Sequence, residues 1–218
     1  MAPLTFAGLS RRITATIGLT CLDQIDGNGS EALKAANIAL KHGKRQQRGS
    51  ISHFTRAMEQ DTRARVQLLQ ELRSAFERER LFVVYQPQIA LGSRQLIGVE
   101  ALLRWRTDDG QFVAPAQFIP LAESSGLIVS LGEWVLRSAC RDLQRIIEHS
   151  GQPLRMAVNV SVAQFRQADF LSTLEHALEE SGIDPSLLEL EITESVAMLD
   201  ASFMIDLLNR IKGLGVSL

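Results

Sequence analysis

The chain has 218 residues, of which 45% are hydrophobic and 22% charged, and its formal net charge is −2. This ordinary globular composition excludes global disorder and allows one or two domains with a real core. The balanced charge gives no reason to expect a nucleic-acid duplex or an anionic membrane as the main partner. Cys21 and Cys140 are too few for a disulfide framework, so we expect a reducing, cytoplasmic compartment. No uncharged run approaches the ~20 apolar residues that cross a bilayer, so we expect no membrane segment in this chain.

Residues 1–55 predict a strand, a loop, a helix and a second short strand. Apolar and polar residues alternate over 13–18, as they do in a half-buried strand. Ser30 is a candidate N-cap for a helix that runs to about residue 46, and 50–54 is a candidate strand. The apolar stripe of that helix is expected to be Leu33, Ala36 and Leu40. Two strands and one helix cannot bury a good core alone, so we expect the end of a larger domain here.

Residues 56–80 predict a charge-rich connector helix, because apolar residues recur there at helical spacing among arginines and glutamates. That stripe comprises Val66, Leu69, Leu72 and Phe76. From residue 81 strands and helices alternate, which predicts an α/β domain with a mostly parallel sheet and helices outside it. Strands are expected at 81–89, 95–105, 156–160 and 187–193, with helices around 136–147, at 168–181 and at 202–214, and a further strand beginning at 216–218.

Three of these strands are expected to pair an apolar face with a polar one, because side chains alternate along a strand. Glu100, Asn159 and Glu191 fall on the polar faces, toward the C-terminal halves of their strands. In a closed barrel such residues line the active mouth, and their oxygen atoms suit a hard cation such as Mg²⁺ or Mn²⁺. Arg104, on the face of Glu100, could hold a phosphate. Spacing alone leaves open that these are unrelated polar residues at strand ends.

Six motifs in this second part resemble one family in order and spacing. They are Tyr85-Gln86-Pro87, Glu100 to Trp105 (EALLRW), Phe118 to Glu123 (FIPLAE), Gly132 to Leu136 (GEWVL), Asn159-Val160-Ser161 and Glu189 to Glu194 (ELEITE). The family they resemble is EAL, which comprises bacterial cyclic di-GMP phosphodiesterases with a TIM-like (β/α) barrel. The resemblance covers about 81–218 and implies the N-terminal half of such a barrel.

The resemblance also implies roles for individual residues. The implied metal ligands are Glu100, Asn159 and Glu191. The implied catalytic residues are Glu100, Glu191 and Glu194, the last as the glutamate that steadies a loop beside the metals. The implied ligand contacts are Gln86, Leu103 and Arg104. The implied reaction is cleavage of one phosphodiester of cyclic di-GMP to linear pGpG by water activated with two Mg²⁺ or Mn²⁺ ions, and the resemblance allows a homodimer through the EAL domain.

Residues 1–55 resemble the C-terminal end of a GGDEF domain, the diguanylate cyclase module. The strand at 13–18 and the helix that runs to about residue 46 are similar to a strand and the final helix of that family, whereas Asn37, Lys41 and Gly43 depart from its pattern. The signature loop would lie upstream, so we expect no cyclase activity from these residues, and we interpret Lys44 and Arg48 as solvated cations. The expected organisation is a GGDEF remnant over 1–55, a connector helix over 56–80 and an EAL half-domain over 81–218.

These 218 residues do not contain the later Asp-Asp-Phe-Gly motif of the EAL family, so we expect the chain by itself to be inactive. The favoured interpretation is part of a GGDEF–EAL phosphodiesterase. The alternatives are a non-catalytic cyclic di-GMP receptor or protein-interaction module, or an inactive gene fragment. The departures at Asn37, Lys41 and Gly43 favour a receptor, whereas the presence of Glu100, Asn159 and Glu191 argues against a decayed site. A reading frame that continues into Asp-Asp-Phe-Gly would support the favoured interpretation.

Overall fold

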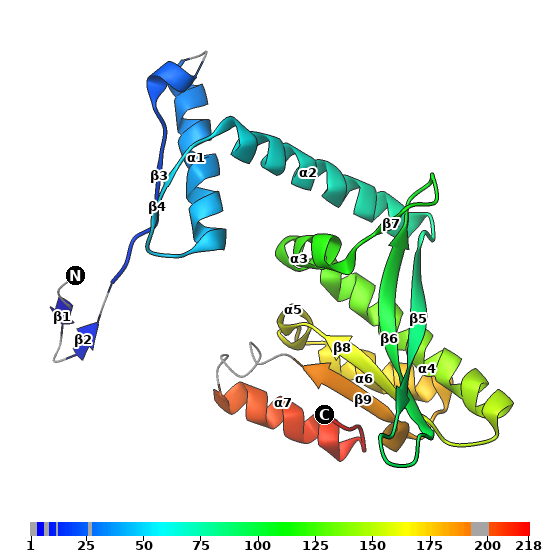
Figure 1. The fold of residues 1–218 in the computed structure, drawn as a ribbon. Helices are drawn as coiled ribbons and strands as arrows, with labels where there is room; N and C mark the ends of the chain where they lie inside the picture. The colour runs from blue at the N-terminus through cyan, green and yellow to red at the C-terminus, as the bar shows by residue number, and fades with distance from the viewer. Residues whose placement is uncertain (1–3, 7–8, 12, 26–27, 193–200) are drawn as a thin grey trace. The chain divides into compact units, whose positions relative to one another are not determined.

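The computed structural model describes residues 4–6, 9–11, 13–25, 28–192 and 201–218. The chain divides into two compact units, Met1–Leu68 and Leu69–Leu218, which are described separately (Figure 1). The division falls inside α2 (Arg56–Glu77), the helix that sequence analysis places at 56–80. The second half of α2 therefore belongs to the second unit.

The first unit contains one helix between two short parallel strands, preceded by a small hairpin. Its elements are β1 (Leu4–Phe6), β2 (Leu9–Arg11), β3 (Ile17–Leu19), the 3-10 helix η1 (Leu22–Gln24), α1 (Gly29–Gln46) and β4 (Ile51–His53). β1 pairs with β2 in antiparallel fashion, and β3 pairs with β4 in parallel. A Cβ atom at Gly18 would lie 2.1 Å from the Ala36 carbonyl oxygen, so the close approach of β3 to α1 requires glycine. The expected strand at 13–18 is thus shifted to β3.

The start and the buried face of α1 both differ from the sequence expectation. Asn28, not Ser30, is the N-cap: its Oδ1 accepts hydrogen bonds from the backbone N–H groups of Ser30 (3.1 Å) and Glu31 (3.4 Å). Leu33 is 72% exposed, so the predicted apolar stripe is wrong at that position. The hydrophobic core of the unit instead contains Ala35, Ile38, Ala39 and Phe54. Two of these four residues are alanines, and a pattern sought among large apolar residues does not reveal them.

The second unit contains a twisted sheet with strand order β5-β6-β8-β9, and β7 pairs with β6. The strands are β5 (Leu81–Ile89), β6 (Leu96–Arg106), β7 (Phe112–Val113), β8 (Arg155–Val160) and β9 (Leu188–Ile192). β6, β8 and β9 are parallel, but β5 and β7 each run antiparallel to β6. The expected mostly parallel sheet is therefore a mixed sheet, because the short connection after Ile89 can form only a hairpin and not a crossover. Ser217 forms a parallel bridge with Glu189, where a further strand was predicted to begin.

Helices cover one face of this sheet (Figure 1). They are α3 (Pro115–Ser125), α4 (Leu127–Ser150), α5 (Val162–Phe165), α6 (Phe170–Ser181) and α7 (Ala201–Gly213), with the 3-10 helix η2 (Pro185–Leu187) before β9. The predicted apolar faces of α4, α6 and α7 are confirmed, since Leu143, Leu174 and Ile211 are each fully buried. They pack against Met156, Leu188 and Leu190 of the strands. The predicted α/β class is confirmed.

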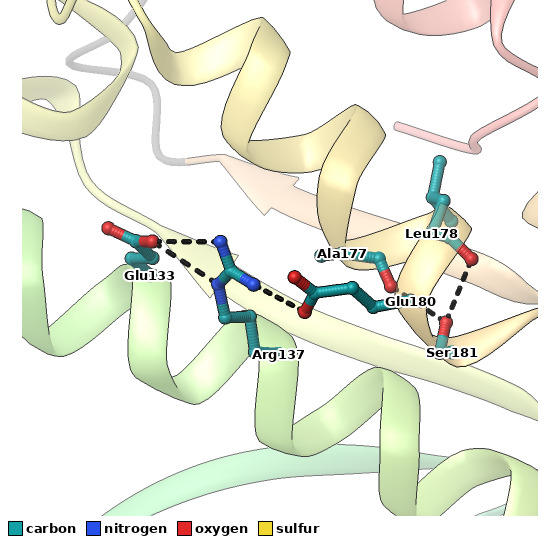
Figure 2. A network of polar contacts seen from close by, with 6 residues as sticks. All are labelled: Glu133, Arg137, Ala177, Leu178, Glu180 and Ser181. Carbon is teal, nitrogen blue, oxygen red and sulfur yellow. Dashed lines mark hydrogen bonds and ion pairs between the residues drawn. The ribbon is translucent and has the colours of Figure 1, made fainter.

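An arginine links α4 to α6 at the surface of this core (Figure 2). The guanidinium of Arg137 contacts Glu133, one turn earlier on α4, at 3.2 Å, and donates a second hydrogen bond to Glu180 of α6. This hydrogen bond holds the pKa of Glu180 below its ordinary value and raises that of Arg137. Ser181, the next residue, turns inward, and its hydroxyl donates to the Ala177 and Leu178 carbonyl oxygens of its own helix. The contact between α4 and α6 therefore consists of buried apolar side chains, with the ion pairs of Arg137 at the surface.

Cys140 and Cys21 should differ sharply in reactivity. Burial raises the pKa of the Cys140 thiol to about 12, whereas Cys21 is exposed. Because the thiolate is the reactive form, we expect one fast-reacting thiol in the native chain at mildly alkaline pH and two after denaturation, measured with a chromogenic disulfide reagent. The contribution of Cys140 to stability is complete below the ordinary thiol pKa and is lost as the pH rises toward about 12. Two fast-reacting thiols in the native chain would contradict the buried placement.

Within the described residues, no single helix is long and apolar enough to cross a membrane. α3 and α4 meet the criteria only when taken together, and they are bent by 117° at the break between them.

Candidate metal and ligand site

The polar face of the sheet brings the predicted metal ligands together. In the strand register Glu100 of β6 lies opposite Gln86 of β5 and Ala157 of β8, and Asn159 of β8 lies beside Glu191 of β9. Residues paired in register share a face, so Gln86, Glu100, Asn159 and Glu191 all lie on the side away from Met156 and Leu190. The two-faced strands inferred from the sequence are present.

One expectation about position along the strands is wrong. Asn159 and Glu191 lie near the C-terminal ends of β8 and β9, but Glu100 lies near the middle of β6. β6 continues to Arg106 because its last residues pair with β5 and β7. Its pairing with β8 covers only Gly98–Ala101, so Glu100 still lies at the end of the parallel part of the sheet.

The three oxygen-bearing side chains form a small acidic group. The Asn159 Nδ2 donates a hydrogen bond to the Glu100 Oε1 at 2.7 Å. Burial raises the pKa of the half-buried Glu191 carboxyl, and the negative charges of Glu100 and Glu189 raise it further. Two repelling carboxylates beside an amide oxygen fit a hard divalent cation, which would offset the repulsion. Among the described residues no three His, Cys, Asp or Glu side chains gather to hold a metal, so the third ligand would be the Asn159 amide.

An ion pair that sequence reasoning missed borders this group. Arg155 of β8 and Glu189 of β9 lie 3.2 Å apart, on the same face and earlier along each strand. Arg155 precedes Asn159 by four residues, so the alternation that located Asn159 also places Arg155 on the polar face. In the strand register Glu189 lies level with Glu100 across Ala157, but the ion pair occupies its carboxylate, so Glu191 is the carboxylate of β9 that is left for a cation.

The predicted ligand contacts divide between the two faces of the sheet. Gln86 is exposed opposite Glu100, and Arg104 is half-buried on the same face, where its Nη1 donates to the Leu103 carbonyl oxygen at 2.9 Å. Among the described residues Arg104 has no ion pair, so its guanidinium has donors available for a ligand. Leu103 lies on the opposite face. Glu194, the remaining predicted catalytic residue, lies outside the described residues.

A cavity of about 300 Å³ lies where β6 and β8 end beneath α3 and α4. Leu103 and Arg104 both line it, although they lie on opposite faces of β6. Its other polar lining comes from Glu123, Asn159, Ser161 and Gln164. Sequence analysis did not identify Gln164, although Ser161 followed three residues later by Gln164 is a capping-box pattern.

Residues 69–218 match the sequence model of the EAL domain. The chain is 38% identical over 207 residues to the bifunctional diguanylate cyclase/cyclic di-GMP phosphodiesterase MucR of Pseudomonas aeruginosa, covering 95% of this chain and 30% of MucR. It is 36% identical to the cyclic di-GMP phosphodiesterase NbdA of the same organism, covering 99% of this chain and 28% of NbdA. The chain thus spans about a third or less of these relatives.

Solved structures of EAL proteins are also similar to this chain. A P. aeruginosa MucR phosphodiesterase in complex with c-di-GMP aligns with a TM-score of 0.66 and 43% identity, covering 69% of this chain and 61% of that one. An EAL enzyme with cAMP and cyclic di-GMP bound aligns with a TM-score of 0.69 and 27% identity, covering 88% and 50% of the two chains.

Proposed function

Because the chain belongs to the EAL domain family, we propose that it binds cyclic di-GMP and a divalent cation as part of a phosphodiesterase site. The observation that carries this proposal is the group formed by Glu100, Asn159 and Glu191, in which Asn159 contacts Glu100 at 2.7 Å and lies in register with Glu191. The named activities of MucR and NbdA support the choice of ligand and reaction. Cyclic di-GMP carries two phosphodiesters, so a cation and an arginine fork on one face are suitable partners for it.

Each residue has a definite part in this proposal. Bound Mg²⁺ or Mn²⁺ would lower the pKa of a water molecule and stabilise negative charge on the phosphoryl oxygens. Glu100 and Glu191 would supply the carboxylates that hold the ion, and the hydrogen bond from Asn159 fixes the orientation of the Glu100 carboxylate. Arg104 would hold a phosphate through its planar fork, and Gln86 would offer an amide to a guanine edge.

We further propose that residues 1–55 are the end of a GGDEF domain that precedes the EAL domain. The arrangement of α1 between β3 and β4 accommodates this assignment. The match to MucR covers 95% of the chain, so it includes part of the first unit, and MucR is named as a cyclase as well as a phosphodiesterase. If the first unit takes no part in the proposed site, replacing it should leave cyclic di-GMP binding by residues 69–218 unchanged.

Arg104→Ala should weaken cyclic di-GMP binding roughly 10–100-fold, because a hydrogen bond to a charged group contributes about 1.5–3 kcal/mol and 1.4 kcal/mol corresponds to a factor of ten. Isothermal titration calorimetry in the presence of Mn²⁺ would measure the change. Arg106→Ala is the matched control: it lies on the same face and strand, but its guanidinium stacks over the Phe82 ring at 5.8 Å. Equal affinity of the Arg104→Ala variant and the native chain would remove Arg104 from the site, and no binding by the native chain would contradict the proposed function.

A further inference from the structure

Gln164 forms a buried polar contact directly after the strand that carries Asn159. The residue is only 6% exposed, although its side chain is polar. Its Oε1 accepts hydrogen bonds from the Ser161 N–H and the Ser161 hydroxyl, both at 3.1 Å. The Ser161 hydroxyl oxygen in turn accepts from the Gln164 N–H at 3.4 Å. These reciprocal bonds fix the turn between β8 and α5.

Gly132 of α4 lies against the Gln164 side-chain amide. A Cβ atom at Gly132 would lie 1.9 Å from the Gln164 Nε2 and 2.4 Å from its Cδ, so any larger residue at position 132 would force the Gln164 amide to move. Phe165, the next residue, is fully buried and stacks against Phe170 at 4.8 Å between ring centroids. The position of Gln164 is therefore constrained by the close approach of Gly132 as well as by its hydrogen bonds to Ser161.

We propose that Gln164 is a positioning residue for the candidate site: its amide oxygen fixes the turn after β8 and through it the orientation of the Asn159 side chain. Only Val160 separates Asn159 from Ser161, and Asn159, Ser161 and Gln164 all line the same cavity. Asn159 is itself exposed, so its orientation depends on the strand end and on its bond to Glu100. Loss of the Ser161 bonds would free the strand end next to it.

Two substitutions separate the hydrogen bond from the packing. Gln164→Met keeps the length and volume of the side chain but removes the acceptor, whereas Gln164→Glu keeps an acceptor for Ser161. Gly132→Ala places a methyl group against the amide and should displace it without changing Gln164 itself. Ser181→Ala is the matched control, since it deletes another buried hydrogen-bonding side chain, on α6, whose partners are carbonyls of its own helix (Figure 2).

The readouts are the affinity for Mn²⁺, measured by electron paramagnetic resonance, and the side-chain amide NMR resonances of Asn159, assigned with Asn159→Asp. Gln164→Met and Gly132→Ala should shift these resonances and weaken Mn²⁺ binding about 10–100-fold, the usual cost of losing a partner that orients a metal ligand. Gln164→Glu should retain most of the affinity, and Ser181→Ala should lower the melting temperature without changing either readout.

The Mn²⁺ readout rests on the proposed function, whereas the Asn159 resonances do not. If the native chain fails to bind Mn²⁺, the proposed function is wrong, and the resonances alone decide the role of Gln164. If Gln164→Met lowers the melting temperature but leaves the Asn159 resonances in place, Gln164 is merely structural and the proposal is overturned. If Gln164→Met does not fold, the comparison of Gly132→Ala with Gln164→Glu decides in the same way.

Discussion

Glu100→Gln should weaken Mn²⁺ binding by more than about 10–100-fold. That range is the usual cost of losing a residue that only orients a metal ligand, and Glu100 is proposed to be a ligand itself. The substitution should leave the melting temperature nearly unchanged. The substitution removes one of the two carboxylates of the group, which lie on the same face of β6 and β9, and an amide is a poorer ligand for a hard cation. Glu100 is half-buried on the polar face and outside the apolar core, so little packing is lost. Electron paramagnetic resonance titration and thermal denaturation would measure the two quantities.

Glu189→Gln is the control for this prediction. Glu189 lies on the same face, two residues before Glu191, but its carboxylate is paired with Arg155 at 3.2 Å. It changes the charge of the face by the same amount as Glu100→Gln and should alter Mn²⁺ affinity far less. If both variants lose affinity equally, the ion is attracted by the overall charge of the face and is not held by Glu100, and the assignment of Glu100 as a ligand fails.

The faces of individual elements could be predicted from the sequence because they depend on local periodicity. The buried positions of α6 and α7 and the two faces of β8 and β9 follow from spacings of three to four and of two residues. The direction of β5 relative to β6 depends on how the chain returns between them, and a mostly parallel sheet was the wrong expectation. The N-cap of α1 likewise depends on which side chain reaches the free N–H groups of the first turn. Asn28 reaches them, whereas Ser30 was expected to be the N-cap.

The candidate site was predictable to the same extent. The alternation of apolar and polar residues along each strand predicted that Glu100, Asn159 and Glu191 lie on polar faces, and the strand register puts them on one face. Their residue types already indicated a cation. The role of Gln164 was not predictable in this way, because it depends on the approach of Gly132 from a helix more than twenty-five residues earlier in the chain. The pairing of Arg155 with Glu189 needed the register of two strands, which the sequence of either strand alone does not contain.

A substitution on the apolar face of β6 should lower stability and leave Mn²⁺ binding unchanged, the reverse of the result expected for Glu100→Gln. Trp105 is 2% exposed and makes an edge-to-face contact with Phe118 of α3 at 5.7 Å between ring centroids. Trp105→Ala should lower the free energy of unfolding by about 3–5 kcal/mol, because it deletes a large buried side chain and leaves a cavity under α3. Urea denaturation followed by circular dichroism would measure this change.

Phe112→Ala is the matched control, since Phe112 is also an aromatic residue paired with the end of β6 but is 69% exposed. Its loss should change the free energy of unfolding by no more than about 1.5 kcal/mol, because Phe112 is exposed and its ring contact is an edge-to-face one with Phe82 at 6.2 Å. Well below its melting temperature, the Trp105→Ala variant should still bind Mn²⁺ with native affinity, because Trp105 and Glu100 lie on different faces of one strand. If Trp105→Ala instead removed Mn²⁺ binding from a folded chain, the two faces of β6 would not be separable into a core and a site, and the alternation on which the ligand assignment rests would be wrong.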